Sequence, residues 1–375
     1  RDGFRSGDRR ARLLRLERLE DRALLAAAPI DLTAVPNPFG LSPAADFTVD
    51  QNPKLDPPIV HSPVSVASAD VDANGLLDLV TANYQANTVS ILLGKGDGTF
   101  GPAVEYAVGN SPVQVLLTDL DANGRFEVVT ANQGDDTVTI LWNYHQGKFA
   151  SQTTLAVGDS PESVAVADVN PSADPAKLKD NRLDLVVANS GGTTMSVLLQ
   201  NTNYTFAAPV DYHVGTSPSM VALGDVNGDG IPDAFTTNRG DDTVSVLLNN
   251  GHGMFVAPVV YDVGHGPESL VLGDLTGDGR LDMAVANRSS STVSVLLGLG
   301  GGQFATQVAY PTGGWPASIA MGDMTHDGIP DLVTANEAGN SISVLRGNGD
   351  GTFAPDSELT TPSAYQVTVA DIDGD

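Results

Sequence analysis

The sequence predicts an all-β protein, built from a repeated four-stranded unit that packs around an axis as a β-propeller. Three observations support this prediction: an acidic nine-residue loop occurs six times, short strands and tight turns separate the copies, and the spacing is nearly constant. The first residues of successive loops are 49, 49, 57, 49 and 49 positions apart. A period of this length is typical of architectures in which each repeat is one supersecondary unit.

The fourth repeat shows the unit most clearly. It contains an apolar strand at 220–224, the acidic loop, an apolar run at 234–237, a turn at 238–242 and an alternating strand at 243–248. A glycine-rich turn then leads to Phe255, and a last strand runs to Gly264. Four such strands form one meander, which is too small to be stable alone, and repeated meanders pack as propeller blades.

Two further residue types recur in the same register. Asparagine follows every second strand, at Asn83, Asn132, Asn189, Asn238, Asn287 and Asn336. Phenylalanine opens every fourth strand, at Phe100, Phe149, Phe206, Phe255, Phe304 and Phe353. We interpret both sets as structural: the asparagines fix an Asx-type turn, and the phenylalanines fill the seam between blades.

The composition narrows the function classes. The 375 residues include 46 acidic and 19 basic ones, for a formal net charge of −27, which argues against nucleic acid as a partner. Cysteine is absent, which excludes disulfides and thiolate metal sites. No apolar run is long enough to cross a membrane as a helix, so we expect no transmembrane segment.

The acidic loops have the pattern of a calcium site. Positions 1, 3, 5 and 9 carry oxygen-bearing side chains, position 6 is Gly in all but the third loop, and position 7 would offer its backbone carbonyl. Every complete loop has three carboxylates. An EF-hand is rejected, because position 12 is Thr or Val in the uninterrupted loops and a β-type run follows. Magnesium is the weaker candidate, since it usually keeps several waters.

We therefore expect about one Ca²⁺ per complete blade. The expected ligands in loops 1 to 3 are Asp70, Asp72, Asn74, Leu76 and Asp78; Asp119, Asp121, Asn123, Arg125 and Glu127; and Asp168, Asn170, Asp180, Arg182 and Asp184. Those in loops 4 to 6 are Asp225, Asn227, Asp229, Ile231 and Asp233; Asp274, Thr276, Asp278, Arg280 and Asp282; and Asp323, Thr325, Asp327, Ile329 and Asp331. An incomplete seventh copy offers Asp371, Asp373 and Asp375. The insertion 171–179 makes the third site the least regular.

The Asp-x-(Asp/Asn/Thr)-x-(Asp/Asn)-Gly-x-x-Asp loop, with Phe-Gly/Ala-x-Pro and Gly-x-Ser-Pro elements around it, resembles the FG-GAP repeat family and its VCBS-like bacterial members. The resemblance covers residues 62–375. It implies a seven-bladed propeller of the kind found in integrin α-subunit heads. It also implies calcium in the loop between the first two strands of a blade, and a partner on the opposite face.

The ends of the chain suggest how a seventh blade would close. Residues 39–49 resemble the fourth strand of a blade, and a seventh first strand begins near Tyr365. We therefore expect a truncated seventh blade that joins the two ends. The predicted organisation is an export-type segment at 1–28, a linker with the closing strand at 29–61, and the propeller at 62–375.

The first 28 residues contain the string Leu-Glu-Asp-Arg-x-Leu-Leu-Ala at 19–26. It resembles the planctomycete extracellular N-terminal motif of large exported bacterial proteins. The apolar spacing from Leu13 onwards is compatible with a short basic amphipathic helix. Because the chain begins without Met and stops inside an acidic loop, we expect it to be part of a larger protein, outside the cell or on its surface.

Three kinds of function fit these features. The first is a non-enzymatic module that binds an extracellular protein or glycan, with Tyr84, Arg239, Arg288 and Trp315 as candidate contacts on the face opposite the acidic loops. The alternative is a propeller enzyme, such as a calcium-dependent polysaccharide lyase, or a spacer in a giant surface protein. We expect no catalytic residues, because no nucleophile, metal-hydrolase or phosphate-loop motif occurs. The tripeptide at 239–241 is interpreted as a Gly-Asp turn rather than an integrin ligand, because Gln133 takes the place of Arg in the second repeat.

Overall fold

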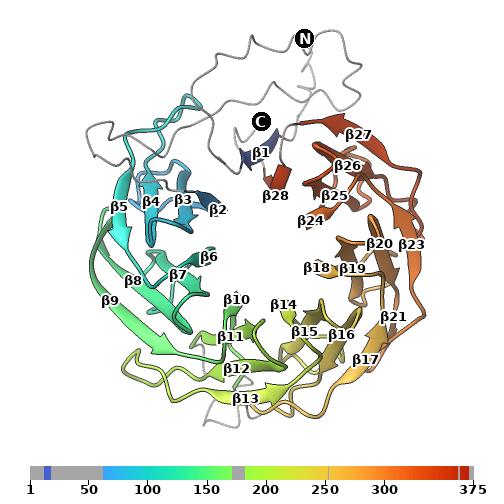
Figure 1. Ribbon diagram of the computed structural model, residues 1–375, viewed down its shortest axis with the longest axis horizontal. Coiled ribbons are helices and arrows are strands. Elements are labelled where there is room, and N and C mark those ends of the chain that lie inside the picture. The colour runs from blue at the N-terminus through green and yellow to red at the C-terminus, as the bar shows by residue number, and fades with distance from the viewer. Residues whose placement is uncertain (1–11, 18–61, 171–181, 252, 362–363, 371–375) are drawn as a thin grey trace, which may run out of the picture.

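The computed structural model describes residues 12–17, 62–170, 182–251, 253–361 and 364–370, and the described secondary structure is entirely β-strand (Figure 1). Six four-stranded antiparallel sheets are arranged as blades around a central axis. In each blade the first strand lies innermost and the fourth outermost. The prediction of an all-β propeller with four-stranded blades is confirmed.

The strands follow the repeat. Blades 1 and 2 contain β2 (Pro63–Ala69), β3 (Asp78–Asn83), β4 (Thr88–Leu92) and β5 (Val104–Ala107), then β6 (Pro112–Thr118), β7 (Glu127–Asn132), β8 (Thr137–His145) and β9 (Lys148–Ala156). Blades 3 and 4 contain β10 (Pro161–Ala167), β11 (Asp184–Asn189), β12 (Thr194–Leu198) and β13 (Val210–His213), then β14 (Pro218–Gly224), β15 (Asp233–Asn238), β16 (Thr243–Leu247) and β17 (Val259–Asp262). Blades 5 and 6 contain β18 (Pro267–Gly273), β19 (Asp282–Asn287), β20 (Thr292–Leu296) and β23 (Val308–Pro311), then β24 (Pro316–Gly322), β25 (Asp331–Asn336), β26 (Ser341–Leu345) and β27 (Ser357–Thr360). A small hairpin in blade 5 adds β21 (Gly298–Gly300) and β22 (Gln303–Phe304).

The seventh place in the ring holds two strands instead of a blade. β28 (Ala364–Ala370) lies beside the first strand of blade 6 and pairs antiparallel with β1 (Arg12–Glu17) (Figure 1). The expectation of seven blades is therefore wrong for the described residues, which form six blades. The helix proposed from Leu13 is also wrong over 12–17, because pairing with the open edge of β28 outweighs the local apolar spacing. The strand expected at 39–50 lies outside the described residues.

Hydrogen bonds from side chains connect the first strands of neighbouring blades into a ring. In each, a backbone N–H of one first strand donates to a side chain of the strand before it. The bonds include Val115 N to Ser65 Oγ (3.2 Å), Val221 N to Ser163 Oγ (3.2 Å), Ile319 N to Ser269 Oγ (3.3 Å) and Val367 N to Ser318 Oγ (3.3 Å). The ring closes where Val66 N donates to Gln366 Oε1 at 2.8 Å, across 300 positions of sequence. β28 thus acts as a seventh inner strand.

The hydrophobic core lies between blades rather than within them. One cluster combines Val80 and Ile91 of blade 1 with Val128 and Leu141 of blade 2. At four seams the repeated phenylalanine meets a tyrosine from the fourth strand of the preceding blade, and between blades 2 and 3 Phe206 packs in a cluster that contains Leu155 instead. The edge-to-face pairs are Tyr106–Phe149, Tyr212–Phe255, Tyr261–Phe304 and Tyr310–Phe353, with ring centroids 5.4–5.5 Å apart. The prediction that the phenylalanines fill the seams is confirmed for these four.

The repeated asparagine closes each turn from inside the blade. Asn238 is fully buried, and its amide donates to Thr243 Oγ1 (3.0 Å) and Ser245 Oγ (2.9 Å). Its carbonyl oxygen accepts from Thr236 Oγ1 (3.1 Å) and from the backbone N–H of Gly215 (3.1 Å). This one side chain therefore ties the second strand to the third and to the link from the preceding blade.

Asn238→Ala should lower the free energy of unfolding by about 2–3 kcal/mol, because it leaves buried hydroxyl and amide groups without partners. Urea unfolding followed by circular dichroism measures the change. Asn203→Ala, at an exposed hairpin position, is the control and should change stability by less than about 0.5 kcal/mol. Equal effects at the two positions would contradict the structural role of Asn238.

A half-buried carboxylate, Asp356, lies at the outer side of blade 6. Ser343 Oγ donates to Asp356 Oδ2 at 2.9 Å, but burial raises the pKa of Asp356 to about 6. In blade 5 the equivalent pair is Ser294 with Gln307, which cannot ionise. Because the pKa is raised in the folded state, ionisation of Asp356 opposes folding, and stability falls as pH rises from about 4 to about 6.

Asp356→Gln, which copies blade 5, should therefore raise stability at pH 7.5 by about 1–2 kcal/mol after solvent screening is allowed for. At pH 4 most of the gain should disappear, because Asp356 is then protonated in the folded state and only partly ionised in the unfolded state, where its pKa is about 3.8. Melting temperatures of the two proteins across pH 4–8 measure this difference. A gain that is the same at every pH would show that the charge of Asp356 is irrelevant.

Candidate metal centres and ligand face

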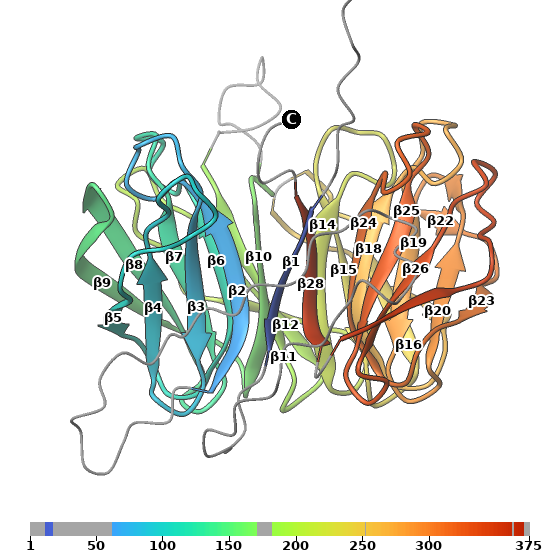
Figure 2. The ribbon, with the colours of Figure 1, turned by 90° about the horizontal axis from the view of Figure 1, so that it is seen from above.

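Strand register places the acidic loops and the turns at opposite ends of each blade. In blade 1, Ala69 pairs with Asp78 at the loop end, and Pro63 pairs with Asn83 at the turn end. The same register recurs in the other five blades. The strands run between two rims of the propeller (Figure 2), so all acidic loops gather on one rim. We call this the loop face and the other the ligand face.

In the five uninterrupted loops the first carboxylate organises the loop backbone. In loop 1, Asp70 Oδ1 and Oδ2 accept from the backbone N–H groups of Asn74 (3.0 Å) and Gly75 (2.7 Å), and Asn74 Oδ1 accepts from Leu76 N (2.7 Å). At Asp274 and Asp323, partial burial opposes ionisation, but several loop N–H groups outweigh it and lower the pKa. These carboxylates are therefore held in the charged form that binds cations.

The ninth-position carboxylate is buried and held at both oxygens. Asp78 accepts from Val71 N through Oδ2 and from Gly94 N through Oδ1, each at 2.8 Å. The same two bonds occur at the ninth position of the other five loops. Burial, followed by the neighbouring carboxylates, raises the pKa of Asp78, and burial raises the pKa of Glu127 to about 7. A bound cation would offset this cost of burying charge.

Two loops bring three carboxylates together. Ligand atoms of Asp70, Asp72 and Asp78 lie within 4.8 Å of one another, and so do those of Asp119, Asp121 and Glu127. Among the described residues, no other loop gathers three carboxylates in this way. The reason is that position 3 is Asp in loops 1 and 2 but Asn or Thr in loops 3 to 6. Every complete loop has three carboxylates in its sequence, so the carboxylate count alone did not set loops 1 and 2 apart from the other four.

Buried oxygens at position 3 fit a hard cation. Asp121 Oδ1, Asn170 Oδ1 and Thr325 Oγ1 are buried and have no hydrogen-bond partner among the described residues, so each offers a lone pair to a cation or to an ordered water. The donor set is oxygen throughout, as calcium prefers. Hydrogen bonds within the loop leave position 3 unused in these three blades. The residues thus fit a calcium ion.

Some predicted ligands are less well placed or lie outside the description. In loop 5, Asp278 pairs with Arg280, so the two expected ligands contact each other. Asp180, Asp371, Asp373 and Asp375 lie outside the described residues. Ligation through the position-7 carbonyls of Leu76, Arg125, Arg182, Ile231, Arg280 and Ile329 stays a prediction.

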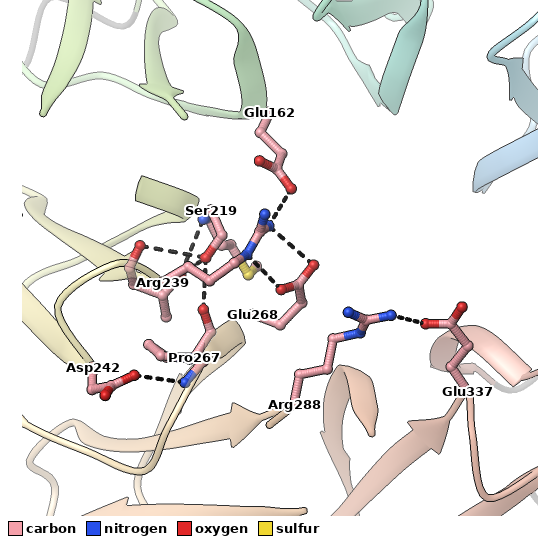
Figure 3. A network of polar contacts seen from close by, with 11 residues as sticks. Glu162, Ser219, Arg239, Asp242, Pro267, Glu268, Arg288 and Glu337 are labelled. Atoms are coloured by element: carbon pink, nitrogen blue, oxygen red, sulfur yellow. Dashed lines mark hydrogen bonds and ion pairs between the residues drawn. The ribbon is translucent and has the colours of Figure 1, made fainter. Parts of the chain in front are cut away.

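On the ligand face, charged side chains bridge neighbouring blades (Figure 3). Arg239 of blade 4 pairs with Glu162 of blade 3 and, through Nε at 2.8 Å, with Glu268 of blade 5. Arg288 of blade 5 pairs with Glu337 of blade 6 at 2.5 Å. Burial raises the pKa of Glu268 although Arg239 lies beside it. The face therefore carries an arc of two neighbouring ion-paired groups, which together contain two guanidinium groups and three carboxylates.

Trp315 extends this arc toward solvent. The guanidinium carbon of Arg288 lies 4.7 Å from the centre of the Trp315 ring, and Trp315 is 48% exposed. Its φ of 59° is unfavourable for a bulky residue, whereas Ser or Gly takes this place in the other five blades. Such strain is often found at functional sites. The remaining predicted contact, Tyr84, takes in blade 1 the turn position that Arg239 and Arg288 take in blades 4 and 5. Its backbone N–H donates to Ser62 O at 3.1 Å.

Sequence reasoning missed Glu162 and Glu268. Both follow the proline that opens a first strand, where the other blades have Val64, Val113, Ser219 and Ala317. A charged residue at an otherwise uncharged position was the available signal.

The interpretation of residues 239–241 as a Gly-Asp turn is confirmed. Asp241 Oδ2 accepts from Thr216 N at 2.5 Å, and Asp135 Oδ2 accepts in the same way from Asn110 N in blade 2.

Solved structures with a similar fold include enzymes and a protein-binding domain. A candidate 6-phosphogluconolactonase from Bacteroides fragilis is 17% identical, with 84% of this chain and 89% of that chain covered and a TM-score of 0.62. Virginiamycin B lyase from Staphylococcus aureus is 14% identical (80% and 84% covered, TM-score 0.53), and BBS1N, crystallised in complex with ARL6DN, is 16% identical (81% and 81% covered, TM-score 0.51). At these identities the likeness shows the fold alone.

No relative is found among curated protein sequences. The FG-GAP-like repeat family, in contrast, matches six times, over residues 70–130, 119–171, 178–236, 225–285, 274–334 and 323–375. Successive matches overlap by one acidic loop or lie only a few residues apart, so they cover most of the propeller. The chain therefore belongs to the FG-GAP-like repeat family.

Proposed function

We propose that this chain is an extracellular bacterial β-propeller that binds Ca²⁺ in its acidic loops and binds a protein or a glycan on its ligand face. The observation that carries the calcium proposal is the loop geometry. Position 1 is held ionised in loops 5 and 6, position 9 is buried with both oxygens fixed, and position 3 has unpartnered buried oxygens in three blades. When bound, calcium would supply the positive charge that compensates these carboxylates.

The chemistry of the two faces supports different roles for them: metal binding on the loop face and partner binding on the ligand face. The loop face repeats the same chemistry in all six blades, as a structural role would require. The ligand face differs from blade to blade and gathers Arg239, Arg288 and Trp315 in one arc. Aromatic and Arg side chains are the usual anchors of binding surfaces. BBS1N, which shares the fold, was crystallised with a protein partner.

An enzyme is the alternative, because lyases and a candidate lactonase adopt this fold. The ion-pair arc also breaks the symmetry of the repeats, as an active site would. In the described part of the arc, however, both guanidinium groups are already paired with carboxylates.

Within the described residues, no helix is both long and apolar enough to span a membrane.

Calcium should raise the melting temperature, and chelation should lower it. With Kd values of about 10⁻⁴–10⁻³ M and 10 mM calcium, each filled site adds about 1.4–2.7 kcal/mol. Differential scanning fluorimetry with calcium, magnesium or EDTA measures the effect, and calorimetric titration counts the sites. Indistinguishable melting curves under the three conditions would refute the proposal.

Asp78→Asn serves as the site-specific arm of this experiment and should remove one site from the titration. Asp97→Asn is the matched control, because Asp97 lies in an exposed hairpin of the same blade and bonds only Thr99. It should leave the number of sites unchanged. A loss of binding in both variants would indicate a general effect of charge.

Trp315→Ala should weaken binding of a ligand identified by glycan-array or pull-down screening by about tenfold or more, as expected for a central anchor. Tyr144→Ala is the control, because Tyr144 is an exposed aromatic residue at the loop end of blade 2. Surface plasmon resonance with both variants separates the two faces. If Tyr144→Ala alone reduced affinity, the binding site would belong to the loop face.

A further inference from the structure

One residue near the end of the third strand contacts the acidic loop of its own blade: it lies two positions after this strand in five blades and within the longer strand β8 in blade 2. At this position stand Gly94, Asn143, Gln200, Asn249, Gly298 and Gly347, one in each blade. In every blade its backbone N–H donates to the ninth-position carboxylate of that blade, at distances of 2.7–3.4 Å. Where the residue is glycine, it makes no further side-chain contact.

In blades 2, 3 and 4 the side chain of this residue also reaches the loop of the preceding blade. Asn143 Nδ2 donates to the carbonyl oxygen of Val71, at position 2 of loop 1, at 2.7 Å. The corresponding bonds are Gln200 Nε2 to Leu120 O (3.0 Å) and Asn249 Nδ2 to Val169 O (2.7 Å). All three side chains are only 2–3% exposed.

These bonds form a chain from one candidate metal centre to the next. The Val71 peptide donates its N–H to Asp78 in loop 1 and accepts from Asn143 through its carbonyl. Asn143 in turn donates its own N–H to Glu127 in loop 2 (3.4 Å), and its amide also donates to Phe126 O there (3.2 Å). One residue therefore touches the buried carboxylate region of loop 2 and the backbone of loop 1.

The hairpin that begins at Asn143 lies over both loops. A Cβ placed on Gly147 would stand 3.4 Å from Cβ of Asp72, so this hairpin packs on position 3 of loop 1. From the other side, Arg125 of loop 2 donates to Tyr144 O at 2.8 Å. The same hairpin therefore contacts both loops.

On the basis of the proposed calcium function, we propose that Asn143 couples the metal sites of loops 1 and 2, so that they fill cooperatively. Calcium in loop 2 would fix Glu127 and the hairpin, and the hairpin would then hold Val71 and Asp72 in place for the second ion. The entropy of ordering this segment would be lost once for two ions, which is positive cooperativity. Loops 5 and 6 lack such a bridge, because Gly347 has no side chain.

The test measures calcium protection of each loop by amide hydrogen exchange and mass spectrometry. Peptides covering 70–78 and 119–127 report loops 1 and 2 in the same sample. In the wild-type chain, Glu127→Gln should raise the calcium midpoint of loop 1 about fivefold or more, the lower end of typical coupling. In the Asn143→Gly background, adding Glu127→Gln should leave the loop 1 midpoint unchanged.

Three controls make the result specific. Asn143→Gln should keep the coupling, because Gln200 performs this role in blade 3. Asp331→Asn in loop 6 should leave the midpoint of loop 5 unchanged. Unaltered exchange in blades 4 to 6 should show that Asn143→Gly still folds, with Asn143→Ala as a second variant.

Two outcomes overturn the inference, in different ways. If Glu127→Gln shifts loop 1 equally with and without the Asn143 side chain, Asn143 is not the coupling residue although calcium binds. If no loop gains protection from calcium in the wild-type chain, the proposed calcium function fails, and the coupling fails with it.

Discussion

No blade of this propeller can bury its own hydrophobic surface, and the rest of the structure depends on this constraint. A four-stranded sheet has two faces, and the core clusters lie where the face of one blade meets the face of the next. All six residues of every second strand are buried, which is possible only with a neighbour on both sides. Burial of each large apolar side chain contributes about 1.5–3 kcal/mol, so most of the stability is shared between blades.

Radial packing of this kind assigns different tasks to the two ends of each blade. At the loop end, the chain must reverse beside a buried carboxylate, and the same hydrogen bonds recur in all six blades. At the other end, the buried asparagine holds the turn from within, so the exposed turn residue is free to vary. The variation from Tyr84 to Arg239 and Glu337 is therefore tolerated by the fold, and it gives the ligand face its uneven chemistry.

Periodic features could be predicted from the sequence, and features that cross between blades could not. The 49-residue period, the loops, Asn238 and its equivalents, and the phenylalanine seams all repeat, so a single chain reveals them. The partners of Arg239 lie 77 and 29 positions away in two other blades, and no sequence period connects them. The strand at 12–17 was missed because its partner, at 364–370, lies near the other end of the chain and its local apolar spacing resembles a helix. The contact of Asn143 with two loops was not predicted, because glycine occupies the equivalent position in three blades and the position therefore shows no repeated residue type.

The closing bond between Val66 and Gln366 has a consequence for how the chain folds. Most contacts join residues of the same or adjacent repeats, so blades can form and stack locally, as in a one-dimensional array. Closing a ring across 300 positions instead of 49 costs only about 1.6 kcal/mol more in chain entropy. The last contact is therefore inexpensive in free energy but late in time, since long-range pairing slows folding. Until it forms, the growing stack exposes one apolar blade face at each end, and this interval is when the protein is most exposed to association with other unfinished chains.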